Sequence, residues 1–346
     1  MAILMTNGMF IIDEIHYGGK IYKNLIGGGS HTIAGACICS DSPEISKGIK
    51  WIVDRGSDFP DKITKELQQW GADIHFRDDS RRLTTRGENI YCDNELRGFR
   101  YLTEKRSIDV KDLVTEFGED EVKNVAAFHL ICSTERAVEI MGQLKQLPLM
   151  RSPVFLWEPL PDICNEVHLK KLIEIMHREE NIILSPNAKE AAGFLGYNEP
   201  LDLAGCKTLI KKFDTLLKNE NAMILRCGKH GSLSLSPKND NKQLRSILHF
   251  PAYHTKTPNK VLDPTGGGNS YLGGFALGYV LSKGDLCIAQ ILGNVAAGCI
   301  VETVGVPKMV CKRWNGLSFR DRLHHYLTTY KLQYTTQNIL AAIQYS

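Results

Sequence analysis

Short apolar runs alternate with amphipathic stretches over most of this 346-residue chain. The runs are typical of buried strands, which the sequence predicts at residues 3–12, 126–131, 154–157, 181–184 and 222–227. Between them, apolar residues recur at helical spacing and predict helices near residues 44–53, 62–70, 135–147, 163–178, 187–195, 207–218, 270–282 and 284–303. Because such alternation is typical of parallel sheets, we expect an α/β fold with a mostly parallel central sheet.

Residues 75–105 break this alternation. The segment begins with a polar and basic stretch that contains Arg77, Arg81, Arg82 and Arg86. Aromatic residues then alternate around a turn signal at Asp93-Asn94, and this pattern predicts a β-hairpin that stands off the main sheet. The arginines form either a solvated face or a lid whose cations meet a phosphorylated ligand. We expect this hairpin to be an insertion in a single domain that spans residues 1–346.

The charge of the chain is nearly balanced, and its net value of +3 gives no reason to expect contact with nucleic acid or a membrane. The N-terminal apolar run is interrupted at Thr6-Asn7-Gly8, so it predicts a strand rather than a signal peptide. No apolar stretch approaches the ~18 residues of a membrane span. The ten cysteines form no Cys-x-x-Cys pair, and we interpret them as buried free thiols in a reducing compartment, the cytoplasm.

A glycine-rich segment carries most of the chemical information. Residues 263–275 have the sequence Asp-Pro-Thr-Gly-Gly-Gly-Asn-Ser-Tyr-Leu-Gly-Gly-Phe, and apolar residues recur at helical spacing from Ser270 onward. Three glycines allow the backbone to approach an anion, and the first N–H groups of a helix favour a phosphate. A glycine turn that merely starts a buried helix has the same pattern, so this segment needs support from others.

Four further segments precede it in a fixed order. They are a strand that ends at Asp13, a glycine turn at 27–36, the Asn-x-x-Glu element in 185–196, and the Gly-x-x-Gly turn in 226–232. Together the five segments resemble the pfkB (ribokinase-like) carbohydrate kinase family over nearly the whole chain. Three segments resemble its fungal maintenance-of-killer (Mak) subgroup: the sequence of residues 263–269, the Trp157-Glu158-Pro159 triplet and residues 85–89.

This resemblance implies a Rossmann-type core with a small β lid, which transfers the γ-phosphoryl group of ATP to a hydroxymethyl group of a sugar or nucleoside. It implies substrate contacts from four residues: Asp13, Gly27, Gly28 and Thr32. It implies nucleotide contacts from four others: Arg226, Gly228, Gly231 and Asn294.

The resemblance also implies a catalytic group and two cation sites. Gly266, Gly267 and Gly268 match the anion hole, whose N–H donors stabilise charge on the phosphoryl group. Asn187 and Glu190 match the element that organises Mg²⁺, an ion that keeps much of its hydration. Finally, a monovalent cation such as K⁺ is implied at the loop of Asp263 and Thr265.

The chain departs from the family pattern at three positions. Asn269 stands where the family has the aspartate general base, and losing a positioned base typically costs ~10²–10⁴ in rate. Phosphoryl transfer depends mainly on positioning and charge stabilisation, so we expect activity to persist at a low rate and Asn269→Asp to raise it. Thr32 replaces the sugar-binding asparagine, and Arg226 replaces the usual threonine.

These departures leave two functions open. The first is a weakened ATP-dependent carbohydrate kinase. The alternative is a non-catalytic pseudokinase with a nucleotide-binding, structural or regulatory role, and protein partners or a homodimer are compatible with either function. Other classes are disfavoured, since the chain has no Gly-x-Gly-x-x-Gly after its first strand, no complete P-loop and no His-Glu-x-x-His.

Overall fold

A nine-stranded sheet forms the centre of the computed structural model, which describes residues 2–17, 19–91, 97–179, 181–238 and 245–344. Its strands lie in the order β13 (Ile247–Phe250), β12 (Ser232–Leu235), β11 (Ala222–Arg226), β10 (Ile182–Leu184), β9 (Val154–Pro159), β8 (Ala127–Cys132), β1 (Leu4–Thr6), β4 (Ile49–Gly56) and β5 (Asp73–Asp79). All neighbours from β11 to β5 pair in parallel, whereas β12 and β13 are antiparallel. The predicted α/β fold with a mostly parallel sheet is therefore confirmed.

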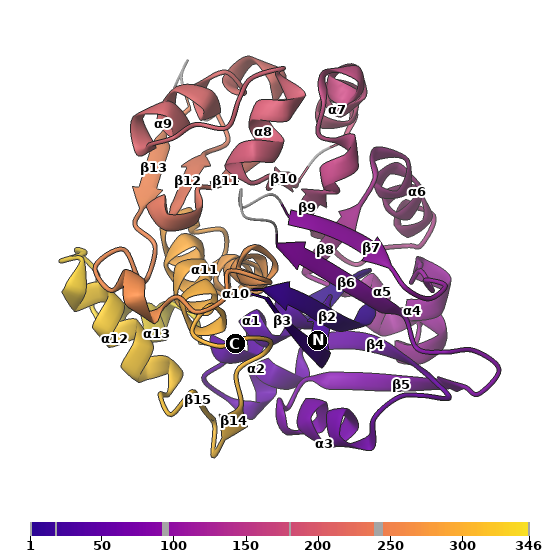
Figure 1. Cartoon of the computed structure of the whole chain (residues 1–346). Helices are drawn as coiled ribbons and strands as arrows, with labels where there is room; N and C mark the ends of the chain where they lie inside the picture. Colours follow the sequence, from indigo (N-terminus) through magenta and orange to yellow (C-terminus); the bar gives the residue numbers. More distant parts are fainter. Residues whose placement is uncertain (1, 18, 92–96, 180, 239–244, 345–346) are drawn as a thin grey trace.

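Helices cover both faces of this sheet (Figure 1). One hydrophobic cluster joins the sheet to α1 (Ser30–Ile38), α2 (Pro43–Lys47), α3 (Asp61–Gln69), α10 (Gly267–Leu281), α11 (Leu286–Ile300), α12 (Phe319–Thr329) and α13 (Thr336–Ala342). A second cluster joins it to α4 (Val110–Phe117), α5 (Glu119–Lys123), α6 (Thr134–Lys145), α7 (Glu166–Arg178), α8 (Ala188–Phe194) and α9 (Leu203–Lys211). Among the described residues, no helix is both long and apolar enough to cross a membrane.

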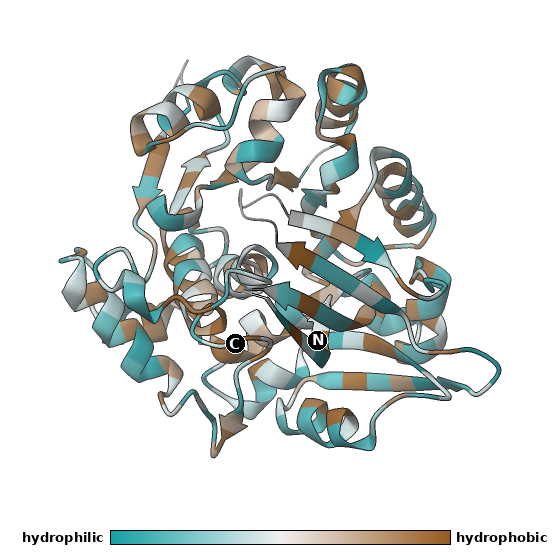
Figure 2. Cartoon of the chain, in the orientation of Figure 1, coloured by the Kyte–Doolittle hydropathy of each residue, from teal (hydrophilic) through white to brown (hydrophobic). Residues whose placement is uncertain are grey.

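Side-chain alternation along the strands creates the two clusters. On β4, Trp51 and Val53 belong to the first cluster and Ile52 to the second. On β11, Ile224 belongs to the first, and its neighbours to the second. Successive strand residues point to opposite faces, so strands that are apolar at every position need helices on both sides. The edge strand β5 instead alternates hydrophilic and hydrophobic residues along its length (Figure 2).

A separate four-stranded sheet forms the lid, in the order β3 (Lys20–Gly28), β2 (Phe10–Tyr17), β6 (Arg86–Tyr91) and β7 (Arg97–Tyr101). β6 and β7 pair antiparallel, as a hairpin requires, while the Asp93-Asn94 turn signal lies outside the described residues. The expected lid range of 75–105 needs correction, because residues 73–79 pair with β4 in the large sheet. Arg77 there forms an ion pair with Asp54 of β4, and Arg81 and Arg86 pair with Asp79 and Asp58.

Two other segment assignments were wrong. Residues 44–53 do not form one helix, since α2 ends at Lys47 and β4 begins at Ile49. The β-branched and aromatic residues of Ile49–Val53 favour a strand. The apolar run 3–12 is likewise two strands, β1 in the large sheet and β2 in the lid, separated near Gly8. A Cβ on Gly8 would lie 2.9 Å from Gly29 Cα, so the backbone at Gly8 packs closely against the backbone at Gly29.

Candidate functional site

The glycine run forms the start of α10, at the carboxyl end of the parallel strands. Gly266 is the N-cap residue, with φ of 76°, and no side chain caps the helix. A Cβ on Gly266 would lie 2.1 Å from His31 Cδ2, so both the backbone conformation and the space require glycine. α10 contacts β8, and the two lie close together in Figure 1. An uncapped helix N-terminus at this edge of the sheet is suited to binding an anion.

A buried arginine lies directly against this helix start. Arg226, the last residue of β11, places Nη1 only 2.1 Å from where a Cβ on Gly268 would lie. Nη1 is 2.6 Å from Glu158 Oε1, and Nη2 is 3.4 Å from Glu190 Oε2. Arg226, Glu158 and Glu190 expose only 9%, 7% and 9% of their surfaces. The Nε atom of Arg226 has no hydrogen-bond partner among the described residues, which leaves one buried N–H for a ligand.

Asn269 belongs to the same cluster through Glu158. Its Nδ2 donates a hydrogen bond of 2.9 Å to Glu158 Oε2. The same oxygen lies 3.3 Å from Nε2 of His129, and Nδ1 of His129 lies 2.9 Å from Thr6 Oγ1. Glu158 is near the end of β9, His129 is on β8 and Thr6 ends β1. Residues from three neighbouring strands thus hold the side chain of Asn269, which the sequence predicts at the position of the general base.

The cluster keeps its charges despite burial. Burial alone raises the pKa of Glu158, but Arg226 and His129 outweigh it and hold this pKa below its usual value. Burial likewise opposes the charge on Arg226, yet Glu158 and Glu190 raise the pKa of the guanidinium. Ion pairs this deeply buried require partners on each charge, because an unpaired buried charge is strongly destabilising.

Asn187 and Glu190, the predicted magnesium residues, lie at the edge of this cluster. They form a capping box at the start of α8: Asn187 Oδ1 accepts from Glu190 N, and Glu190 Oε2 accepts from Asn187 N, each at 2.8 Å. No group of three or more His, Cys, Asp or Glu residues in the described chain is arranged to hold a metal directly. The carboxylate of Glu190 fits Mg²⁺ only in the manner expected of this ion, through water and alongside ligand phosphates.

The Gly-x-x-Gly turn follows Arg226. Gly228 and Gly231 both have positive φ, and a Cβ on Gly231 would lie 2.0 Å from Phe250 O. Cys227 N donates to Gly231 O at 2.7 Å and closes the turn. Asn294, in α11, donates to Ser232 Oγ at 3.1 Å and anchors the strand that follows. The structure therefore brings the predicted nucleotide residues together, and their roles stay predictions.

The predicted substrate residues lie on the lid strands and on α1. Asp13 is on β2, and a Cβ on Gly27 of β3 would lie 2.0 Å from its Oδ2. Nδ1 of His31 is 3.3 Å from Gly28 O, and the same imidazole packs against Gly266. His31 therefore links the lid side of the site to the start of α10.

Thr32 is fully buried where α1 crosses α10. The Cβ of an alanine at Gly273 would lie 1.8 Å from Thr32 O, so the two helices are in close contact here. This placement puts Thr32 in the packing between α1 and α10, and a contact with substrate stays a prediction.

Asp263 and Thr265 form a tight turn before α10. Thr265 N donates to Asp263 Oδ1 at 2.9 Å, and both residues are buried. Asp263 Oδ2 is buried with no hydrogen-bond partner among the described residues. An orphaned buried carboxylate oxygen fits a cation such as K⁺, so the donor set agrees with the expected monovalent site.

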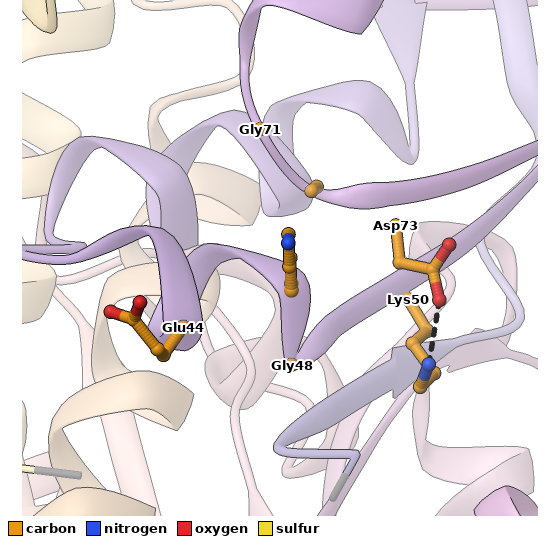
Figure 3. Close-up of a pocket in the computed structure, with 7 residues that line it drawn as sticks. Glu44, Gly48, Lys50, Gly71 and Asp73 are labelled. Atoms are coloured by element: carbon orange, nitrogen blue, oxygen red, sulfur yellow. Dashed lines mark hydrogen bonds and ion pairs between the residues drawn. The ribbon is translucent and has the colours of Figure 1, made fainter.

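A surface depression of about 490 Å³ lies elsewhere, at the start of β4 and β5. Figure 3 shows Lys50 and Asp73 on its wall, where they form an ion pair of 2.6 Å. Ligands of open α/β sheets bind at the carboxyl ends of the strands, whereas this depression is at the amino ends. It is therefore not the site described above.

Sequence reasoning found Arg226, Glu190, Asn269 and the glycines, but it gave no role to Glu158, His129 or His31. Glu158 had a usable signal, since an acidic residue near the end of a buried parallel strand faces the ligand edge of the sheet. His129 and His31 had none, because only the tertiary fold brings them to Glu158 and Gly266.

Comparisons with known proteins show the family and the fold of the chain. No family model matches the chain. The chain is 46% identical to protein MAK32 of Saccharomyces cerevisiae over 99% of its own length and 96% of that protein. Adenosine kinase from Schistosoma mansoni, in complex with 2-fluoroadenosine, has a TM-score of 0.65 at 14% identity, covering 88% of this chain and 96% of that one. Ribokinase from Cryptococcus neoformans, in complex with ADP, has a TM-score of 0.60 at 18% identity and covers 88% and 95%. The chain therefore belongs to the same family as protein MAK32, and it has the ribokinase-like (pfkB) fold.

Proposed function

We propose that this protein is an ATP-dependent phosphotransferase that acts on a hydroxymethyl group of a sugar or nucleoside. The observation that carries the proposal is the buried guanidinium of Arg226 against the uncapped start of α10. Arginine and helix N–H groups are both effective phosphate donors, and here the guanidinium lies beside the first turn of the helix. The ADP and 2-fluoroadenosine complexes of proteins with this fold support a nucleotide and a nucleoside as ligands.

The chemistry follows from this arrangement. The acceptor oxygen attacks the γ-phosphorus, and the bond to the β–γ bridging oxygen breaks as ADP leaves. The N–H groups of Gly266 and Gly268 and the Nε of Arg226 stabilise charge on the transferring phosphoryl oxygens, whereas Gly267 N donates to Pro264 O. Mg²⁺, held through Glu190, supplies further charge neutralisation on the ATP phosphates when it is bound. We also propose that K⁺ binds at Asp263 and Thr265. The proposal further includes a cytoplasmic location and no contact with nucleic acid.

The alternative, a pseudokinase that binds nucleotide without transferring it, also has support. Asn269 cannot act as a base, and the Glu158 carboxylate beside it already accepts hydrogen bonds or ion pairs from three side chains. A low rate is therefore expected even if the protein is an enzyme.

The test is ATP turnover against a panel of sugars and nucleosides, run beside calorimetric titration of MgADP. We expect MgADP binding and a slow phosphoryl transfer to at least one acceptor. Binding with no transfer above background for any acceptor identifies the pseudokinase, and no binding at millimolar MgADP refutes both functions.

A further inference from the structure

Glu158 connects the nucleotide side of the site to Asn269. Its Oε1 accepts from Arg226, and its Oε2 accepts from Asn269 and lies beside His129. The carboxylate is buried and held in its charged form, so it can accept hydrogen bonds but cannot donate one.

A chain of hydrogen bonds determines which groups point at Glu158. Gly8 N donates to Thr6 Oγ1 at 2.9 Å, and Thr6 Oγ1 lies 2.9 Å from Nδ1 of His129. Because the Glu158 carboxylate only accepts, the facing Nε2 of His129 carries a proton, and Nδ1 of the neutral imidazole accepts from the Thr6 hydroxyl. Every polar group of this chain is thereby matched, from the backbone of Gly8 to the carboxylate.

This arrangement determines the orientation of the Asn269 amide. Since Glu158 only accepts, the amide must present Nδ2 to it, and Oδ1 must point the other way. Asn269 lies in the first turn of α10 and is only partly buried, and its Oδ1 is not among the buried unpartnered atoms of the described residues, so this oxygen is accessible to a ligand. An amide oxygen accepts a hydrogen bond from a hydroxyl, although it does not remove the proton.

We propose that Glu158 is a positioning residue for phosphoryl transfer, which holds Asn269 Oδ1 toward the acceptor hydroxyl. The inference rests on the proposed function. The acceptor hydroxyl donates to Oδ1, which aims an oxygen lone pair at the γ-phosphorus. As the new O–P bond forms, the β–γ bridging bond breaks, ADP leaves, and the hydroxyl proton passes to an oxygen of the transferred phosphoryl group. Orientation replaces the missing base.

The same contact changes what Asn269→Asp should do. An aspartate at 269 would face Glu158 at the distance of the present 2.9 Å hydrogen bond. Two carboxylates this close cannot both ionise, so they share a proton and neither is an effective base at neutral pH. The single substitution therefore restores little. The double variant with Glu158→Gln has an amide at 158 and a carboxylate at 269, which exchanges the two groups of the wild-type pair. His129 then takes its other tautomer, with the proton on Nδ1.

The experiment compares wild type, Glu158→Gln, Asn269→Asp and the double variant in steady-state turnover with MgATP and the best acceptor of the panel. Glu179→Gln is the matched control, because Glu179 is also a buried carboxylate, ion-paired to Lys145, but lies outside the site at the end of α7. Circular dichroism and MgADP titration check that each variant is folded and binds nucleotide.

We expect Glu158→Gln to lower kcat at least about tenfold and to raise the acceptor KM, because the Asn269 amide can then flip and point Oδ1 away from the acceptor. Asn269→Asp should change kcat less than about threefold, whereas the double variant should exceed it by about tenfold or more. The inference is overturned if Glu158→Gln leaves kcat and the acceptor KM as in wild type, or if Asn269→Asp alone gains as much as the double variant. Nucleotide binding without transfer by wild type and by every variant refutes the proposed function, and the positioning role with it.

Discussion

Replacement of Arg226 by methionine removes the cation that two buried carboxylates share. Glu158 loses its 2.6 Å ion pair and Glu190 its 3.4 Å contact, while the methionine fills most of the space. Breaking a buried ion pair from one side costs about 3–5 kcal/mol. Glu158 retains hydrogen bonds from His129 and Asn269, and Glu190 retains its helix cap, so we expect a loss near the lower end, about 3 kcal/mol.

The effect should depend on pH with a definite sign. In wild type the pKa of folded Glu158 is lowered, so its contribution to stability is present above the ordinary carboxyl pKa and is lost as pH falls through the lowered value. Without Arg226, burial dominates and raises this pKa above its unfolded value. The variant is then most stable below the unfolded pKa and loses stability as pH rises through the raised value. The two proteins should differ most at neutral pH, and the difference should shrink in acid as pH falls through the lowered pKa of wild-type Glu158.

The assay is urea unfolding of wild type and Arg226→Met between acid and neutral pH, followed by circular dichroism. The double variant Arg226→Met with Glu158→Gln is the control, because it removes the uncompensated charge and should recover part of the loss at neutral pH. A destabilisation of the same size at every pH would refute the electrostatic reasoning and assign the effect to packing alone.

Three further substitutions test the surrounding residues. Glu190→Gln should weaken the Mg²⁺ dependence of nucleotide binding in calorimetry without unfolding the protein. If the Mg²⁺ dependence is unchanged, Glu190 serves only as part of the capping box of α8. Gly268→Ala should weaken MgADP binding at least about tenfold in the same assay, because its Cβ would overlap Arg226. Gly267→Ala is the control and should have a smaller effect, because its Cβ meets only Val301, at 3.1 Å. Equal losses of affinity in the two variants would contradict this. Gly27→Ala should raise the acceptor KM more than the ATP KM, because its Cβ would displace the Asp13 carboxylate. Gly98→Ala, on the same lid sheet, is the control. Equal rises of the two KM values in Gly27→Ala would count against the substrate role of Asp13.

The parts of the fold that depend on local pattern could be predicted from the sequence. The parallel strands from 126 to 227 are short apolar runs, the helices α10 and α11 have apolar residues at helical spacing, and the glycine run marks the start of α10 correctly. The lid was only partly predictable, because the β2–β3 hairpin joins it through a non-local pairing of β2 with β6 that no local pattern encodes. Residues 49–53 were mistaken for a helix because a short apolar run suits either structure.

The site divides in the same way. Its motif residues lie in segments whose order along the chain indicates the family. The network that controls Asn269 joins residues 6, 129, 158 and 269, which come from three strands and a helix. Contacts between such distant positions arise from sheet order, and sheet order is not visible in a single sequence.

Calorimetric titration of MgADP into wild type and Arg226→Met tests the central claim most directly, namely that nucleotide phosphates bind against Arg226 at the start of α10. The account predicts saturable binding to wild type and at least about tenfold weaker binding to the folded variant. Equal affinity for the two proteins would contradict it.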